Sequence, residues 1–360
     1  MTGHAEWRDP VAVRRLAGEI ARLDPGRPVK LMHVCGTHEN AICRHGLRDL
    51  LPPWVRLVAG PGCPVCVCPA AEIDLAIRAA KAGAIVTTFG DVARVPARTT
   101  LMEARAAGAD ARVVYSVADA ALFAAANPGR EVVFFAVGFE TTACTTAAVL
   151  RSGAPRNFSI IASHRYVPPA LDALLATPDI GLDGFLLPGH ATSVTGLHAY
   201  APLAARHGVP MVVGGFEPVD VMVALRDLLA RVGDGRGEAA NAYRRAVRDD
   251  GNPAAMSAIF DVFELRDAAW RGIGTIPGSG LGLAPAHASR DATARLGLAP
   301  DPAIPDAEPG CRCGDVLLGR VEPEDCPLFG SACEPDNPVG PCMVAIEGTC
   351  QARYRHRGHA

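Results

Sequence analysis

The cysteines are the residues of this chain whose type and spacing most clearly predict chemistry. Six of the twelve lie in the last fifty residues, and three more lie in the short stretch GPGCPVCVC. The first residues, MTGHAEWRDPVAVRRL, carry early acidic side chains and no apolar segment, so we expect no secretory signal peptide and a reducing, cytoplasmic environment. Clustered thiols in that environment predict metal or redox chemistry rather than structural disulfides.

The stretch GPGCPVCVC contains a CxxC element formed by Cys63 and Cys66. This spacing suits either a reversible disulfide or half of a metal site. Because the sequence has no second CxxC, a zinc ribbon is disfavoured and a redox-active dithiol is the better hypothesis. Cys68 follows two residues after Cys66 and is a further candidate participant.

The C-terminal cysteines predict a metal centre. Cys311, Cys326, Cys333 and Cys350 are separated by fourteen, six and sixteen residues. Four cysteines spread in this way can hold a [4Fe-4S] cluster or a zinc ion, and spacing alone does not decide between them. The competing ligands in the same segment are Cys313 and Cys342.

Cys35 begins the motif CGTHE, where an expected strand ends and a helix begins. Free backbone N–H groups and the helix dipole at such a junction favour a thiolate. His38 lies three residues further on and could share a metal or a proton with it. We therefore expect Cys35 to be functional, whereas Cys43 and Cys144 are expected to be inert core thiols.

The elements that must position these residues alternate between short β-branched runs and Ala/Leu-rich helical stretches such as 70–83 and 217–233. The expected strands are continuously apolar, as in parallel sheets that are covered on both faces. This alternation predicts an α/β fold, arranged either as one eight-stranded barrel followed by a tail or as two open sheets. The expected strands are residues 29–34, 55–59, 84–89, 112–117, 131–137, 158–163, 184–188 and 210–215.

Nearly every expected strand ends in a polar or glycine-rich motif. Because ligands bind at the carboxyl ends of parallel strands, these motifs predict one shared cleft. Glu140, His164 and His190 follow three of the strands and could move protons there, although plain hydrogen bonding is the simpler role. After these units, residues 237–270 are expected to be helical and residues 271–310 to form an extended, ordered arm.

Composition excludes two classes of partner. Hydrophobic residues make up 49% of the chain and charged residues 20%, which is typical of a folded globular protein. The formal net charge is -3, without a marked run of Lys and Arg, so we expect no nucleic-acid partner. No uncharged stretch reaches the roughly 18 to 20 residues of a transmembrane helix, so we expect no membrane partner.

Taken together, these motifs closely resemble the HypD family of hydrogenase maturation proteins. The resemblance runs from about residue 28 to the end of the chain, and the one departure is the additional thiol of Cys68. The shared motifs are CGTHE from Cys35, GPGCPVC from Gly60, GFETT from Gly138, PGH from Pro188, GFEP from Gly215 and the tail CRCGDVLLG, DCPLFG, PVGPCM and EGTC.

The resemblance implies a scaffold on which the Fe(CN)2CO unit of nickel–iron hydrogenase is assembled, rather than a simple turnover enzyme. It implies a small chaperone partner, HypC, a cyanide donor, HypE, and an indirect contact with the hydrogenase large subunit through HypC. It also favours two facing open α/β domains, 28–127 and 128–233. A third, mainly helical or irregular iron–sulfur domain would combine residues 1–27 with 234–360.

The resemblance also implies roles for individual residues. Cys35 would bind the iron that receives cyanide and CO, His38 would orient or protonate around it, and Thr37 and Glu39 would hold the loop. Cys63 and Cys66 would cycle between dithiol and disulfide, supplied with electrons by a [4Fe-4S] cluster on Cys311, Cys326, Cys333 and Cys350. Glu347 would be a proton or charge partner of that cluster. The alternatives are a thiol–disulfide oxidoreductase fed by an iron–sulfur cluster, and a non-redox protein with a structural zinc tail.

Overall fold

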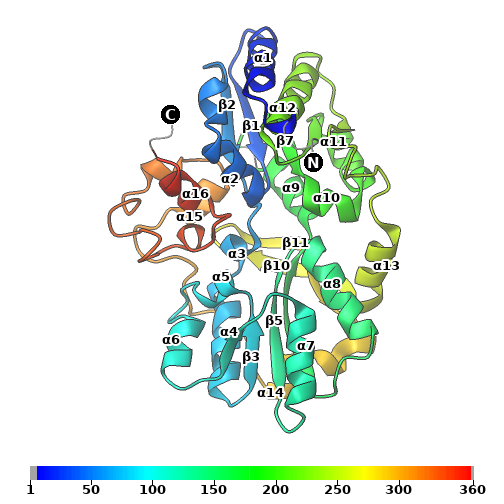
Figure 1. Ribbon diagram of the computed structural model, residues 1–360, viewed down its shortest axis with the longest axis vertical. Coiled ribbons are helices and arrows are strands. Elements are labelled where there is room, and N and C mark those ends of the chain that lie inside the picture. The colour runs from blue at the N-terminus through cyan, green and yellow to red at the C-terminus, as the bar shows by residue number, and fades with distance from the viewer. Residues whose placement is uncertain (1–5, 178, 358–360) are drawn as a thin grey trace.

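The protein, described here by a computed structural model for residues 6–177 and 179–357, contains two separate β-sheets flanked by helices (Figure 1). The first sheet has five parallel strands in the order β2-β1-β7-β8-β9. Its strands are β1 (Val29–His33), β2 (Val55–Ala59), β7 (Gly184–Pro188), β8 (Met211–Gly214) and β9 (Ala239–Asn241).

The second sheet has six strands in the order β10-β11-β6-β5-β3-β4. Four of them are parallel, and the β10–β11 hairpin joins them antiparallel at one edge. The strands are β3 (Ile85–Thr88), β4 (Ala111–Val113), β5 (Val132–Gly138), β6 (Phe158–Arg165), β10 (Phe263–Trp270) and β11 (Gly274–Leu283).

All eight strands expected from the apolar runs are present, and they form two open sheets rather than one barrel. The central strands explain why their sequences are continuously apolar. Every residue of β5 and of β7 is buried, because helices cover both faces of each sheet. The α/β fold class is therefore confirmed, and the barrel alternative is wrong.

The two sheets do not follow the expected boundary between residues 127 and 128. β1 pairs with β7, with Leu31 opposite Gly184, whereas β5 pairs with β3 from the other expected half. The chain therefore crosses from the first sheet to the second after β2 and returns after β6. The close approach of β7 to its neighbours explains Gly184, since a Cβ there would lie 2.9 Å from Leu228 and 3.2 Å from Leu31.

Helices connect the strands, and 3-10 turns complete the connections. The expected helical stretches 70–83 and 217–233 are confirmed as α4 and α12. The helices are α1 (Pro10–Ala21), α2 (Gly36–Arg44), α3 (Pro64–Val67), α4 (Ala70–Lys81), α5 (Gly90–Ala93), α6 (Leu101–Ala106), α7 (Val117–Ala126), α8 (Glu140–Arg151), α9 (Val167–Leu175), α10 (Gly189–Thr195), α11 (Ala201–His207), α12 (Pro218–Gly233), α13 (Pro253–Val262), α14 (Ala292–Leu296), α15 (Cys313–Leu317) and α16 (Thr349–Arg355). The 3-10 turns are η1 (Glu6–Arg8), η2 (Leu47–Leu50), η3 (Leu197–Ala199), η4 (Pro285–Arg290), η5 (Pro323–Asp325) and η6 (Pro341–Met343).

The region after α12 differs from the expectation. Residues 237–270 contain only one helix, α13, because β9 joins the first sheet and β10 joins the second. The expected arm 271–310 begins with β11, which forms a hairpin with β10. Gly272 and Gly274 have φ values of 72° and 112° in the connecting turn, and this backbone conformation favours glycine. The Gly-rich sequence therefore forms a hairpin rather than the start of the expected extended, ordered arm.

The expected third domain, 1–27 with 234–360, is likewise distributed over the molecule. α1 packs against α12 and contributes Leu16 and Ile20 to the core of the first sheet. The cysteine-rich segment is separate from α1 and lies where α16 packs against α2 (Figure 1). Residues 1–5 and 358–360 of that range lie outside the described residues. In the described part of the chain, no helix combines the length and the apolar character needed to span a membrane.

Candidate redox and metal site

Cys35 lies between β1 and α2, at the N-cap position of that helix, as the motif CGTHE predicts. Its backbone is extended, with φ at −153°, and its side chain is buried. The motif GPGC packs directly behind it, because the Gly36 N–H donates to the Gly62 carbonyl at 3.0 Å. A Cβ on Gly62 would lie 2.0 Å from the Cys35 nitrogen. The two motifs therefore require glycine where their backbones meet.

The surroundings of Cys35 do not favour a thiolate, contrary to the expectation from its helix position. Burial raises the pKa of this thiol to about 11, and the negative charge of Glu347 adds to the effect. Hydrogen bonds from the backbone at His38 and Thr37 oppose this rise without cancelling it. Without a bound cation, Cys35 is therefore a neutral thiol at pH 7.

Glu347 lies beside Cys35, far from it in sequence. The Thr37 hydroxyl donates to the Glu347 carboxylate at 2.6 Å, and the Asn40 amide donates to the Ile346 carbonyl at 3.2 Å. Gly36 makes this approach possible, because a Cβ there would lie 2.4 Å from the Glu347 carbonyl oxygen. The loop before α16 is therefore docked on the first turn of α2.

His38 is held in one tautomer inside the protein. Its Nε2 donates to the carbonyls of Gly215 at 3.0 Å and Gly214 at 3.3 Å, and its buried Nδ1 has no hydrogen-bond partner among the described residues. Burial lowers the pKa of His38 to about 3, so the ring is neutral. The Phe216 ring lies 4.9 Å from the His38 ring and stacks at 4.0 Å on His190, so the motif GFEP brings both imidazoles together.

Glu39 is fully buried in an ion-pair network. It accepts from His33 at 2.6 Å, from Arg48, and from Arg353 of α16 at 3.3 Å. Burial alone would raise the pKa of this carboxyl, but Arg48, His33 and Arg353 hold it well below its usual range. The contacts of Glu39 therefore join β1, α2 and α16 around the Cys35 loop.

The CxxC motif forms the short helix α3, with Cys63 at its N-cap position. The Cys66 N–H points at the Cys63 sulfur at 3.3 Å, and both side chains are buried. Burial raises the pKa of Cys63 well above its usual range. Burial also acts to raise the pKa of Cys66, but hydrogen bonds from Cys342 and Cys63 and the charge of Arg271 bring it below its usual range. Cys66 is therefore the thiol of this pair that ionises more easily.

Cys342 connects the CxxC helix to the cysteine-rich segment. Its thiol interacts with those of Cys66, Cys313 and Cys350, and its sulfur lies 2.8 Å from that of Cys313. The structure therefore brings the two clusters of cysteines in the sequence into one continuous set of thiols. All twelve cysteines are free thiols.

The cysteine-rich segment encloses a small apolar cavity, and all six thiols of the segment line this cavity. A set of thiolate donors backed by apolar side chains fits the chemistry of an iron–sulfur cluster. Within residues 6–177 and 179–357, no three His, Cys, Asp or Glu side chains are arranged to hold a single metal ion. The six thiols are those of Cys311, Cys313, Cys326, Cys333, Cys342 and Cys350.

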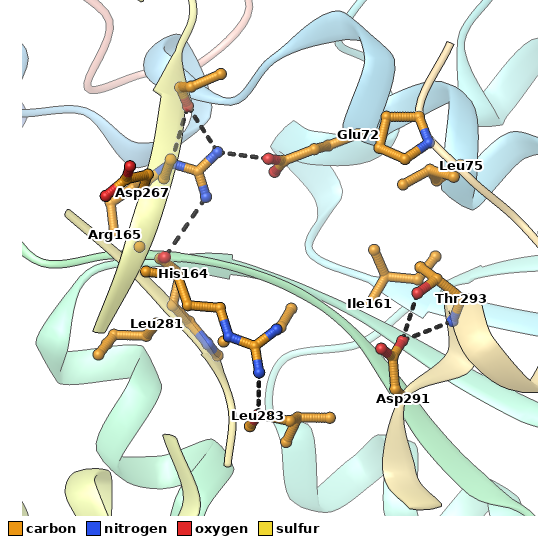
Figure 2. A pocket seen from close by; sticks show the side chains of 17 residues that line it. Glu72, Leu75, Ile161, His164, Arg165, Asp267, Leu281, Leu283, Asp291 and Thr293 are labelled. Carbon is orange, nitrogen blue, oxygen red and sulfur yellow. Dashed lines mark hydrogen bonds and ion pairs between the residues drawn. The ribbon is translucent and has the colours of Figure 1, made fainter. Parts of the chain in front are cut away.

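Cys68 points away from the CxxC pair, into the core of the second sheet. Its sulfur lies 3.4 Å from the Ser163 hydroxyl, which donates to Glu72. Figure 2 shows Glu72 paired with the buried Arg165 in a cavity of about 360 Å³ between β6 and the β10–β11 hairpin. The pKa of Cys68 is raised to about 12 by burial and by Glu72, so it is a neutral core thiol.

The three proton-transfer candidates occupy different environments. His190 is exposed at the start of α10, stacked on Phe216, and near enough to Glu347 to feel its charge. Glu140 is buried at the start of α8, where one oxygen accepts from the Val167 N–H at 2.7 Å and the other has no hydrogen-bond partner in the part of the chain that the structure describes. His164 is buried in the second sheet against Thr146 and Phe263. Only His190 therefore lies with the Cys35 loop.

The two cysteines expected to be inert are only half-buried. The Cys43 thiol donates to Glu39 at 3.3 Å, and that of Cys144 donates to the Thr141 carbonyl at 3.1 Å. The sequence reasoning missed Phe216 and Arg271. The aromatic residue within the motif GFEP was a usable signal for Phe216, whereas a single arginine in a Gly-rich stretch gave none for Arg271.

The fold and the site together define the class of protein. It is an α/β protein in which the CxxC helix and a cysteine-rich segment lie beside the buried loop that carries Cys35. The family model named HypD, described as "Hydrogenase formation hypA family", matches residues 11–357. The chain belongs to the HypD family, whose curated relatives are named hydrogenase maturation factors.

Relatives in bacteria and archaea are similar over nearly the whole chain. The chain is 45% identical to hydrogenase maturation factor HypD2 of Bradyrhizobium diazoefficiens, across 98% of this chain and 97% of that protein. It is 44% identical to hydrogenase maturation factor HypD of Azotobacter vinelandii, across 98% and 96%. A putative hydrogenase expression/formation protein of Methanocaldococcus jannaschii is 43% identical, across 96% and 95%.

Proposed function

We propose that this chain is a scaffold for hydrogenase maturation that holds an iron ion while cyanide and CO are attached to it. The proposal rests on one observation, which is that Cys35, the CxxC pair and the cysteine-rich segment all lie around Glu347. The charge of Glu347 acts on the thiols of Cys35, Cys63 and Cys66, although these residues come from separate parts of the chain.

Cys35 is the proposed protein ligand of the iron substrate. Since its pKa is about 11, the Cys35 thiol keeps its proton until a cation binds. Binding of the cation then releases this proton, which must have an acceptor. The Glu347 carboxylate and the exposed His190 ring are the nearby candidates. Burial of Cys35 and His38 excludes water, which suits thiolate ligation of an electron-rich iron.

His38 is proposed to position the iron rather than to donate a proton. Its Nε2–H is engaged by two backbone carbonyls and its Nδ1 is free, so the ring can only accept at Nδ1 in the neutral state. Thr37 and Glu39 are proposed to hold the loop, Thr37 through Glu347 and Glu39 through Arg353.

Cys63 and Cys66 are proposed to cycle between dithiol and disulfide. Forming the disulfide releases two electrons, and reducing it consumes two. Cys311, Cys326, Cys333 and Cys350 are proposed to hold a [4Fe-4S] cluster, which supplies single electrons when bound. Cys313 and Cys342 then remain as thiols, with Cys342 in contact with both Cys313 and Cys66.

The proposed partners follow from family membership. HypC would supply a second thiol to the iron at Cys35 and carry the finished unit to the hydrogenase large subunit, and HypE would donate cyanide. Such exchange requires an accessible site, and the exposed His190 lies at its edge.

The experiment that tests the proposal is infrared spectroscopy of the chain co-purified without oxygen with HypC and HypE. We expect cyanide and CO stretching bands in the wild type, and no bands in Cys35→Ala. Cys144→Ala is the matched control, because its half-buried thiol lies on α8 outside the site, and it should keep the bands. Bands that persist in Cys35→Ala would show that another residue holds the iron.

A further inference from the structure

The tip of the β10–β11 hairpin places a buried cation beside the CxxC helix. The Arg271 N–H donates to the Val67 carbonyl at 2.8 Å, and Val67 is the last residue of α3. The next residue, Gly272, packs against α15, since its Cβ would lie 2.7 Å from the Gly314 Cα. The hairpin tip therefore lies between the CxxC helix and the cysteine-rich segment, and Figure 1 shows β10 running beside α3.

The guanidinium of Arg271 has no anionic partner of its own. Arg271 is 4% exposed, and its Nε and Nη2 donate to the backbone carbonyls of Asp306 and Pro96. Its Nη1 is buried without a hydrogen bond, and among the described residues no carboxylate forms an ion pair with it. The Asp306 carboxylate accepts from the Ala70 N–H instead.

A buried charge without a counter-ion is costly, so the protein must gain something by keeping it. The charge of Arg271 acts on two neighbouring thiols, Cys66 and Cys68, where it opposes the rise in pKa that burial causes. Cys68 is kept neutral by burial and by Glu72. Cys66 is therefore the thiol that can form an ion pair with Arg271 once the thiol has lost its proton. The other groups that act on Cys66 are the thiols of Cys342 and Cys63 and the carboxylate of Glu347.

We propose that Arg271 is the counter-ion of the reduced CxxC pair, which it stabilises as a Cys66 thiolate beside a Cys63 thiol. This inference rests on the proposed redox cycle of Cys63 and Cys66. Reduction by a small dithiol breaks the Cys63–Cys66 bond and forms the disulfide of the reductant, with two electrons transferred. One of the reductant's two protons goes to Cys63 and the other is released to solvent, because Cys66 stays ionised.

The number of released protons makes the proposal measurable. The probe is a dithiothreitol redox buffer equilibrated with the full chain, purified without oxygen, between pH 6.5 and 8. If Cys66 is a thiolate, the equilibrium constant for reduction rises about tenfold for each pH unit, because one proton is released. In Arg271→Gln we expect the rise to begin at a higher pH, because Cys342 and Cys63 still donate to the Cys66 sulfur but the cation is gone. The constant should then be at least about threefold lower at pH 7.5, which corresponds to about 14 mV.

Two further variants separate charge from structure. Arg271→Lys keeps the charge and loses the fork that binds Asp306 and Pro96, so we expect it to retain most of the wild-type pH dependence. Arg266→Gln removes an exposed guanidinium of the same hairpin, paired with Glu264, and should change nothing. Equal effects of Arg271→Lys and Arg271→Gln would overturn the proposal, because a purely structural role predicts them.

The outcomes also separate this inference from the function on which it rests. If no Cys63–Cys66 disulfide forms in the wild type, the proposed redox cycle is itself wrong. If the disulfide titrates but Arg271→Gln behaves like wild type, only the role of Arg271 is wrong. Should Arg271→Gln fail to fold, a pH-independent constant in the wild type would still overturn the proposal.

Discussion

At the scale of single residues, neighbouring charges and hydrogen bonds determine what each thiol can do. Cys35 and Cys63 have raised pKa values because they are buried near Glu347, whereas Cys66 receives hydrogen bonds and feels Arg271. The sequence identified all three residues but not this difference, because the groups responsible come from positions 271, 342 and 347. Local motifs can thus identify candidate thiols, but not which of them ionises first.

Glu140 should make the stability of the protein depend on pH. Burial raises the pKa of its carboxyl from the ordinary value of 4.5 to about 7. Since the folded pKa is the higher one, this contribution to stability is complete below about pH 4.5 and is lost as the pH rises through 7. We expect the free energy of unfolding of the wild type, relative to Glu140→Gln, to fall by on the order of 3 kcal/mol between pH 4.5 and 8.

Urea unfolding at several pH values measures this difference. The glutamine can still accept the Val167 N–H bond, so the packing of α8 against α9 is retained. Tyr166 and Tyr200, which feel the charge of Glu140, have raised pKa values and stay neutral in this range. A wild type and a variant with parallel pH profiles would show that Glu140 is ionised in the folded protein.

Arg48 should contribute to the stability of the folded protein, because it pairs with the buried carboxylate of Glu39. Replacing it by methionine leaves the Glu39 carboxylate with His33, the Cys43 thiol and the partly exposed Arg353, and removing one partner of a buried pair costs about 3 kcal/mol. Arg236→Met, which breaks the exposed pair with Asp234, should cost less than about 1 kcal/mol. Chemical denaturation at pH 7 compares the two, and equal losses would contradict the network described around Glu39.

At the scale of elements, the strands were predictable because each apolar run is buried on both faces, as β5 and β7 are. The β10–β11 hairpin was not predictable from its pattern. Residues 264–269 of β10 are largely exposed, and β11 is interrupted by glycines, so neither strand shows a buried face in its sequence. This hairpin carries Arg271 to the CxxC helix, so the element that the sequence missed is also the one that supplies the cation.

The contact between the motifs CGTHE and GPGC should fail if Gly62 gains a side chain. In Gly62→Ala the new Cβ would meet backbone atoms of Val34 and Cys35 at 2.0 to 2.4 Å, and backbone cannot move aside as a flexible side chain can. We expect a loss of at least about 2 kcal/mol in unfolding free energy. The matched control is Gly18→Ala in α1, where nothing lies within 4 Å and alanine should stabilise the helix by about 0.5 to 1 kcal/mol.

Thermal or urea unfolding of both glycine variants decides this prediction. Gly62→Ala should also lower iron retention at Cys35, because the N-cap position of α2 must shift. A Gly62→Ala protein as stable as Gly18→Ala would contradict the close packing of the two motifs.

At the scale of the whole molecule, the chain crosses three times between two sheets, after β2, β6 and β9, and its C-terminal segment returns to the loop that follows the first strand. The sequence predicted two open sheets through family resemblance, but it assigned the strands to the wrong sheets. The reason is that β1 finds its partner β7 more than 150 residues later, and local patterns carry no information on such pairing. The same long-range return brings Glu347 to Cys35, which sequence order could not show.

Single alanine substitutions in the cysteine-rich segment should distinguish the four proposed ligands of the [4Fe-4S] cluster from the other two thiols. Alanine at Cys311, Cys326, Cys333 or Cys350 should remove most of the acid-labile sulfide and its iron, whereas alanine at Cys313 or Cys342 should leave both largely in place. All six thiols line one cavity, so the two groups of variants are matched in location, and the buried Cys333 and Cys350 are the ligands that match the buried Cys313 and Cys342. Retention of sulfide in Cys311→Ala with loss in Cys342→Ala would reassign the ligands.

The measurement that tests the account most directly is the iron and sulfide content of the chain, purified with HypC in the absence of oxygen. A bound [4Fe-4S] cluster would contribute about four irons and four sulfides, and the iron that we propose is held at Cys35 would contribute one more without sulfide. We expect iron to exceed sulfide by one per chain, and this excess to disappear in Cys35→Ala while the sulfide remains. Equal iron and sulfide in the wild type, or zinc without sulfide, would contradict the account.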